Sequence, residues 1–117
     1  MLHFQPYTAE PGQRIVRAGD PADALYLISK GEVEVMVDGR RINTRGPGEF
    51  FGEMALLSGD RRSADITALD YCRFAVLSGR DFHRFLHRYP EIRNQIAALA
   101  AERSRQAAAQ PTMARDG

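Results

Sequence analysis

The chain has 117 residues, of which 44% are hydrophobic and 26% are charged, so it has the size and composition of one globular domain and not of a disordered segment. Its 16 lysines and arginines against 15 aspartates and glutamates leave a formal net charge of +1, which gives no basic surface for nucleic acid. The single cysteine, Cys72, excludes an internal disulfide, and no apolar run approaches the roughly 18 residues of a membrane-spanning helix. We therefore expect one soluble domain, compatible with a reducing compartment, with no nucleic acid partner and no direct membrane insertion.

Residues 3 to about 77 have the pattern of short strands separated by turns. Glycine and proline recur at short intervals, and Asp38-Gly39 is a strong signal for a hairpin turn. Val33, Val35 and Val37 alternate with other residues, which places the three valines on one face of a half-buried strand. Many short strands with such turns predict a mainly β domain, either a β-sandwich or a small barrel.

Residues 78 to about 106 have the periodicity of helices. Ser78 precedes Asp81 by three residues, in the manner of a capping box. Apolar side chains then predict two helical stripes separated by Pro90, which suits the first position of a helix: Phe82, Phe85, Leu86 and Tyr89, then Ile92, Ile96 and Leu99. Residues 107–117 are small and polar and include a proline, so we expect a flexible tail.

One segment, GEFFGEMALLSGDRRSAD, differs from the strands around it. Its residues 52–57 include Glu, Met, Ala and Leu, all good helix formers, which predicts a short helix inside the β region. Gly52 lets backbone approach a ligand, the N–H groups at the start of the helix attract an anion, and the guanidinium fork of Arg62 suits two phosphate oxygens. Ser63 adds a hydroxyl donor, whereas Glu53 is an acceptor that suits a ligand hydroxyl such as that of ribose. The set predicts a site for a sugar phosphate.

The run FGEMALLSGDRRSA resembles the phosphate-binding cassette of the cyclic-nucleotide-binding domain family. The run LYLISKGEVEV resembles the strand–glycine–strand segment of that family, with Gly31 at the expected glycine, and the resemblance covers about residues 10 to 106. It implies a mainly β fold with C-terminal helices (α+β): a cyclic-nucleotide-binding β-roll or jelly-roll barrel with a short internal cassette helix. The domain would span residues 1–106, with the β-roll at about 3–77 and hinge and lid helices at about 78–106.

The resemblance also implies roles for the cassette residues. Gly52 and Glu53 would meet the ribose 2′-OH and the phosphate region, and Ala55 would give a backbone N–H to the phosphate. Arg62 would pair with the equatorial and axial phosphate oxygens. Ser63 would contact the phosphate and, in a syn nucleotide, a guanine amino group. The expected ligand-binding residues of the cassette are Gly52, Glu53, Met54, Ala55, Arg62 and Ser63.

A further residue comes from the last helix, which in this family is a lid over the purine. The run from Pro90 to Arg103 resembles that helix of bacterial cyclic-nucleotide-gated potassium channels, in which an arginine at the place of Arg103 caps the base. Arg103 falls on the otherwise apolar stripe four residues after Leu99, and a cap on the base would explain its position. The residue pattern by itself also allows a buried partner for the cation, or a side chain that snorkels to solvent at the helix end.

The cassette departs from the family pattern at two positions. Arg61 replaces the usual proline, and it either competes with Arg62 for the phosphate or points to solvent. Asp65 stands where threonine is common, and it could pair with either arginine. In the family a threonine at position 63 favours cGMP, so Ser63 favours cAMP, with cGMP as a second ligand.

The function that the resemblance implies is a regulatory module and not an enzyme. It would bind cAMP, without a metal, and pass the closure of the lid helix to an effector. Few residues precede the first strand or follow the last helix, so we expect the effector in a larger chain or its oligomer, with a bacterial ion channel or transporter preferred. Such a domain would lie in the cytoplasm or at the inner face of the membrane.

Two alternatives remain beside this interpretation. The first is a degenerate interaction domain that keeps the fold and binds no nucleotide. The second is a metal enzyme of the cupin kind, which is disfavoured because His3 is the only histidine of the β region. His83 and His87 have the spacing of a metal-binding pair on a helix, but no third ligand is evident, and a solvated face explains them.

Overall fold

The computed structural model describes the backbone of residues 3–116 and the side chains of residues 3–106. Its β region consists of two antiparallel four-stranded sheets. The first sheet has the order β1 (Phe4–Ala9), β8 (Cys72–Ser78), β3 (Ala24–Lys30) and β6 (Phe50–Phe51). The second has the order β2 (Arg14–Val16), β7 (Asp65–Ala68), β4 (Val33–Val37) and β5 (Arg40–Arg45). No strand pairing joins the two sheets within residues 3–116, so the roll is not a closed barrel.

The main hydrophobic core lies between the two sheets. Its buried residues come from both sheets: Ala9, Val16, Ile28, Val33, Val35, Phe51, Ile66, Ala68, Cys72 and Phe74. The predicted inward face of β4 is confirmed for Val33 and Val35, which are 0% and 5% exposed, whereas Val37 at the end of the strand is only partly buried. Cys72 is a core residue whose thiol has a raised pKa because it is buried, which agrees with a packing role and not a catalytic one.

Gly31 lies in the tight connection between β3 and β4. Its φ is +86°, and a Cβ at this position would lie 2.4 Å from the Tyr71 carbonyl oxygen and 2.7 Å from Cys72 Sγ. Both the backbone conformation and the close approach of the start of β8 therefore require glycine here. This is the physical reason for the glycine that the sequence pattern singled out.

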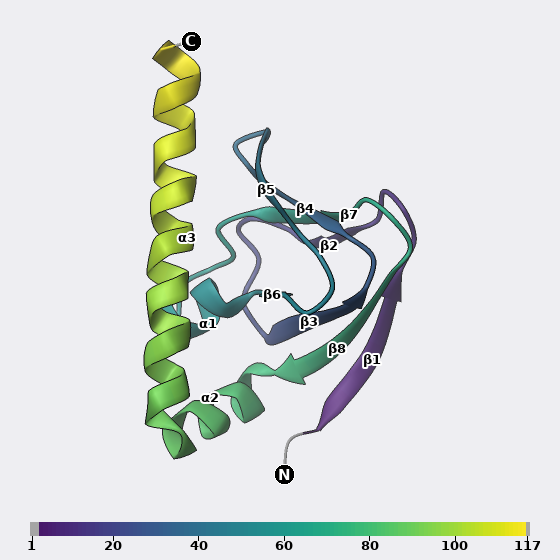
Figure 1. Cartoon of the computed structure of the whole chain (residues 1–117), viewed down its shortest axis with the longest axis vertical. Helices are drawn as coiled ribbons and strands as arrows, with labels where there is room; N and C mark the ends of the chain where they lie inside the picture. The colour runs from purple at the N-terminus through teal and green to yellow at the C-terminus, as the bar shows by residue number, and fades with distance from the viewer. Residues whose placement is uncertain (1–2, 117) are drawn as a thin grey trace.

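Three helices complete the fold, and Figure 1 shows the long α3 standing beside the two sheets, with α1 between them and α3. They are α1 (Glu53–Ser58), α2 (Gly79–Arg88) and α3 (Pro90–Asp116). A second hydrophobic cluster joins α1, β8 and α2 through Leu56, Leu77, Phe82 and Leu86, with Ile96 of α3 packed against it. This cluster fixes the start of α3 relative to the cassette helix α1. No helix within the described residues has the length and the apolar character needed to cross a membrane.

The predicted helical stripes need two corrections. Leu99 was expected on the buried face of α3, but it is 37% exposed, because α3 turns the small residues Ala97, Ala100 and Ala101 towards α1. Tyr89 was expected on the buried face of α2 but is 45% exposed at the end of that helix. In addition, α3 continues to Asp116, past the expected end near residue 106, and the flexibility of residues 107–117 stays a prediction.

The start of α2 is capped as the sequence predicts. The Ser78 hydroxyl oxygen accepts a hydrogen bond from the Asp81 backbone N–H at 3.2 Å. We expect Ser78→Ala to lower the free energy of unfolding by about 1 kcal/mol, the usual value of such a cap, in urea denaturation followed by circular dichroism. Ser78→Asp keeps an acceptor at this position and should stay close to the native value. Equal losses in both variants would contradict the capping role.

Candidate functional site

A small cavity lies where β6, α1, the start of β7 and α3 come together. Its volume is about 50 Å³, and all seven residues predicted to bind ligand line it: Gly52, Glu53, Met54, Ala55, Arg62, Ser63 and Arg103. The other lining residues are Val16, Val35, Arg45, Phe51, Ala64 and Ile66. The structure therefore brings the cassette and the distant Arg103 to one place, although their individual ligand contacts stay predictions.

The cassette enters the cavity through β6 and Gly52. Phe51 is buried and stacks on Tyr26 of β3 with ring centroids 4.8 Å apart, which anchors the residue before the glycine. Gly52 then caps α1 with a φ of +96°. A Cβ on Gly52 would lie 2.7 Å from Arg62 Nη1 and 2.9 Å from the Ala24 carbonyl oxygen, so only glycine lets the cassette backbone approach the arginine this closely.

Arg62 is the central cation of the cassette, and it is only 6% exposed. Its Nη1 donates to the Gly52 carbonyl at 3.0 Å and its Nη2 to the Ala24 carbonyl at 2.8 Å. Asp23 is a weaker partner, since its carboxylate is 3.5 Å away and its side chain is 84% exposed. A guanidinium has five N–H donors, so two carbonyl bonds orient Arg62 and still leave donors for an anion.

Glu53 and Arg103 form a buried ion pair across the cavity. Arg103 Nη1 lies 2.5 Å from Glu53 Oε1, and the two side chains are 9% and 2% exposed. The Arg103 guanidinium also lies over the Phe50 ring, 5.0 Å from its centroid. The buried partner explains the cation on the apolar stripe, and the snorkelling alternative is wrong for this structure. The Glu53 carboxylate therefore pairs with a side chain of α3 and is shielded from solvent.

Sequence reasoning missed Arg45, the last residue of β5. Its side chain lines the cavity and is only 5% exposed. A regular hairpin through Asp38-Gly39 would pair Val33 with Thr44, but a bulge near Val35 shifts the register by one residue, so that Val33 faces Arg45. The shift turns Arg45 to the buried face that Val33 occupies. The sequence carries no clear signal for such a bulge.

Positive charge outweighs negative charge among the side chains that line the cavity around Arg45. Burial lowers its pKa, and the positive charge of Arg103 lowers it further, whereas Glu53 and Glu49 act in the opposite direction. Three arginines and one glutamate line the cavity, so positive charge prevails there. The cavity is therefore suited to an anionic ligand.

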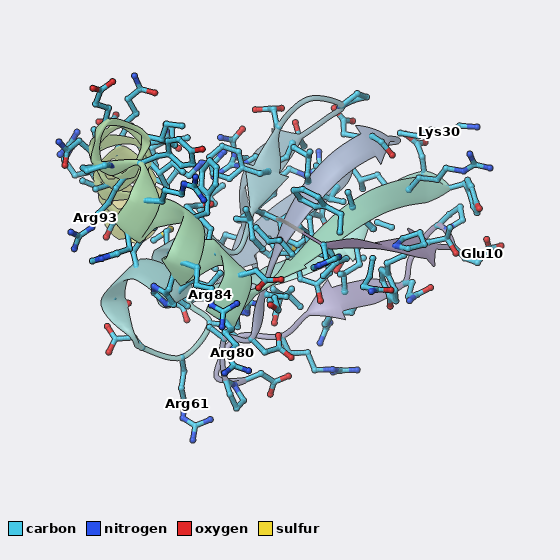
Figure 2. All side chains as sticks on the ribbon, turned by 90° about the horizontal axis from the view of Figure 1, so that it is seen from below. Glu10, Lys30, Arg61, Arg80, Arg84 and Arg93 are labelled. Carbon is cyan, nitrogen blue, oxygen red and sulfur yellow. The ribbon has the colours of Figure 1, made fainter. Side chains whose placement is uncertain are left out.

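The two departures from the family pattern lie outside this arrangement. Arg61 donates to the Gly19 carbonyl at 3.0 Å, and Figure 2 shows it pointing away from the body of the molecule. Asp65 accepts the Ala18 N–H at 2.8 Å and forms no ion pair with either neighbouring arginine among the described side chains. His83 and His87 are exposed, and no group of three metal-ligating side chains forms in the described part of the chain.

A wider groove adjoins the cavity on the side of α3. Its volume is about 400 Å³, and it runs between α1 with the following loop and one face of α3. Met54, Ala55 and Ser63 line both spaces. Ligand sites usually measure roughly 300–1,000 Å³, so the inner cavity alone is too small for a nucleotide. The adjoining groove supplies the additional volume that a nucleotide needs.

The chain was compared with known families and proteins. The sequence profile of the family described as "Cyclic nucleotide-binding domain" matches residues 7–89. A protein of Rhodopseudomonas palustris described as a potassium channel protein is 38% identical over 89% of this chain and 26% of its own length. Human potassium/sodium hyperpolarization-activated cyclic nucleotide-gated channel 4 is 35% identical over 87% of this chain and 8% of its own length.

Solved structures give the same result at the level of the fold. The Thermus thermophilus catabolite activator protein aligns with a TM-score of 0.78 and 33% identity over 96% of this chain and 55% of that protein. A cAMP-bound structure described as PfPKA-R aligns with a TM-score of 0.75 and 25% identity over 85% of this chain and 35% of that one. The chain thus spans 26% and 8% of the length of the two channel proteins, and about half of the activator protein. It belongs to the cyclic-nucleotide-binding domain family.

Proposed function

We propose that this domain binds a cyclic nucleotide, cAMP in preference to cGMP, and that binding moves α3 and so signals to an effector. The observation that carries the proposal is the buried guanidinium of Arg62, held against Gly52 and Ala24 with donors to spare, at the edge of a cavity where positive charge prevails. A cyclic phosphate carries one negative charge and two free oxygens, which match a guanidinium fork.

The other cavity residues would complete the site around that phosphate. Glu53 is the only carboxylate among the lining residues, and an acceptor beside an anion site suits the ribose 2′-OH. Ala55 would give a backbone N–H to the phosphate, and Ser63, exposed at the rim, would add its hydroxyl. In the family a threonine at position 63 favours cGMP. This chain has Ser63 there, with the hydroxyl but without the methyl group, so we expect cAMP to bind more tightly than cGMP.

Movement of α3 would follow from the Glu53–Arg103 pair. Arg103 is paired with the Glu53 carboxylate that the ribose hydroxyl would use, so the ligand must compete with Arg103 for Glu53. We propose that Arg103 leaves Glu53 and caps the purine, as a cation can stack on an aromatic ring. Since Arg103 is on α3, its change of partner would couple the pocket to the helix and to whatever follows it.

The effector is proposed from the relatives. Two of them are described as channel proteins, which favours a cytoplasmic regulatory domain of an oligomeric ion channel or transporter. Calorimetric titration of the chain with cAMP and with cGMP tests ligand binding itself. We expect saturable binding at one site, tighter for cAMP. Absence of binding of both nucleotides at millimolar concentration would favour instead a domain that keeps the fold and has lost the ligand.

The proposed lid contact predicts the effect of Arg103→Ala. A cation over an aromatic ring is worth about 0.5–2 kcal/mol, so we expect cAMP affinity to fall about two- to thirtyfold. Leu99→Ala, on the same helix but exposed, should leave the affinity unchanged. Calorimetric titration of the three proteins measures this. Unchanged or tighter binding by Arg103→Ala would show that Arg103 only blocks the empty pocket.

A further inference from the structure

Helix α2 carries basic side chains along one face. They recur at intervals of three and four residues, so they share roughly 140° of the helix circumference, and all of them are exposed: Arg80, His83, Arg84, His87 and Arg88. The opposite face already packs in the domain, since Phe82 and Leu86 are buried with residues of α1 and β8. Helix α2 is therefore attached by its apolar face and presents its basic side chains to the outside.

The basic surface continues onto the start of α3. A hollow of about 230 Å³ is lined by His83 and His87 of α2 together with Arg93 of α3, so side chains of the two helices lie next to one another there. Figure 2 shows Arg80, Arg84 and Arg93 on the same side of the molecule. We call this surface, formed by the five residues of α2 and by Arg93, the basic face.

The positive charge of the basic face is not neutralised by its neighbours. Residues 79–93 contain four arginines against Asp81 and Glu91, and the totals of 16 basic and 15 acidic residues leave 12 and 13 for the rest of the chain. Among the side chains of residues 3–106, none of these four arginines forms an ion pair with an acidic side chain. The formal net charge of +1 therefore conceals a local surplus of positive charge, which attracts a polyanionic surface.

The form of the basic face favours a lipid surface over other anionic partners. Its arginines point outwards from a helix and diverge, so they do not converge on one small anion as the side chains of a pocket do. The centre of a protein–protein interface is usually apolar and poor in charge, but the one large apolar side chain exposed in residues 79–93 is Tyr89, at the end of α2. Anionic lipids need neither a pocket nor a complementary shape, because their headgroups form an extended negative surface.

We propose that the basic face binds the anionic headgroups of a membrane surface by electrostatic attraction, without insertion of α2 into the hydrocarbon. Each arginine close to such a surface strengthens binding about fivefold, the ratio that corresponds to ~1 kcal/mol. Because the apolar face of α2 stays in the domain, binding should depend on charge and should weaken as salt screens it. The inference goes beyond nucleotide binding, and it rests on the proposed function only in that a regulatory domain of a channel lies close to a membrane.

Cosedimentation of the chain with lipid vesicles tests the proposal. One set of vesicles contains phosphatidylcholine with about one third phosphatidylserine, and the other contains phosphatidylcholine alone. We expect the native chain to bind the anionic vesicles at low salt and not the neutral ones. The variant Arg80→Gln/Arg84→Gln removes two charges from the basic face and should bind the anionic vesicles about 10- to 30-fold more weakly. The matched control, Arg40→Gln/Arg73→Gln, removes two exposed arginines of the strands and should bind like the native chain.

Several results would overturn the proposal. Equal losses in the two double variants would show that only the net charge matters, and equal binding to neutral and anionic vesicles would exclude the headgroups as the partner. Tighter binding to duplex DNA than to the anionic vesicles at the same salt would make nucleic acid the partner instead. Thermal unfolding should show that both double variants fold like the native chain, since all four positions are exposed.

Calorimetric titration with cAMP separates this inference from the proposed function. The Arg80→Gln/Arg84→Gln variant should bind cAMP like the native chain, because neither arginine lines the cavity or the groove. If the native chain binds the anionic vesicles but no cyclic nucleotide, the proposed function fails and the inference holds. If it binds cAMP but not the anionic vesicles at low salt, only the inference fails.

Discussion

In a calorimetric titration of the Arg62→Ala variant, we expect cAMP to bind about 10- to 100-fold more weakly than to the native chain. Hydrogen bonds to a charged group are worth about 1.5–3 kcal/mol, and each 1.4 kcal/mol is a factor of ten in affinity. Arg62 is buried at the edge of the cavity and already oriented by the carbonyls of Gly52 and Ala24, so little further ordering would oppose its contact with a phosphate.

Two further variants make this result specific. Arg80→Ala removes an exposed arginine on α2 that lines neither the cavity nor the groove, and should bind cAMP like the native chain. Arg62→Lys keeps the charge but not the fork, and should give an intermediate loss. Thermal unfolding of Arg62→Ala should show a folded but less stable protein, because two carbonyls lose their donor. Binding within twofold of native by a folded Arg62→Ala protein would contradict the phosphate role.

For Gly52→Ala we expect loss of both stability and binding. At a φ of +96° an alanine costs about 1–2 kcal/mol in backbone strain alone. Its Cβ would in addition lie 2.7 Å from Arg62 Nη1 and 2.9 Å from the Ala24 carbonyl oxygen, so the arginine must leave its position. Since Arg62 is the proposed phosphate contact, cAMP affinity should fall at least as far as in Arg62→Ala.

Gly59→Ala is the matched control for this prediction. Gly59 caps the other end of α1 with a φ of +78°, and a Cβ there would meet no atom within 4 Å. It should therefore show the backbone strain without the displacement of Arg62, and keep native affinity. Urea denaturation and calorimetric titration of the two variants separate the effects. Equal affinities of the Gly52 and Gly59 variants for cAMP would show that the close approach at Gly52 has no role in binding.

Local pattern in the sequence was enough to predict the β region, the short cassette helix and the capped start of α2. The alternation of Val33 and Val35 and the capping residue Ser78 depend only on near neighbours, so they could be read without tertiary contacts. The presence of Gly52 and Arg62 in one short segment likewise predicted the central residues of the candidate site. The resemblance to a known family added Arg103, which is too far along the chain for spacing alone to bring to the cassette.

The remaining features depend on how distant segments meet. Leu99 continued the helical stripe in sequence, but the face of α3 that meets α1 carries small alanines instead. The partner of Glu53 lies 50 residues away on another element. Arg45 faces the cavity only because a bulge in β4–β5 shifts the register by one residue. None of these could be predicted from local periodicity, since each is decided by packing between elements.

The most direct test of the proposed binding mode is a crystal structure of this chain with cAMP. We expect the phosphate oxygens within about 2.7–3.2 Å of the Arg62 guanidinium, the ribose hydroxyl on the Glu53 carboxylate, and Arg103 moved from Glu53 to the base. A structure in which the nucleotide lies elsewhere, or in which the Glu53–Arg103 pair remains closed over the cavity with ligand bound, would contradict this account.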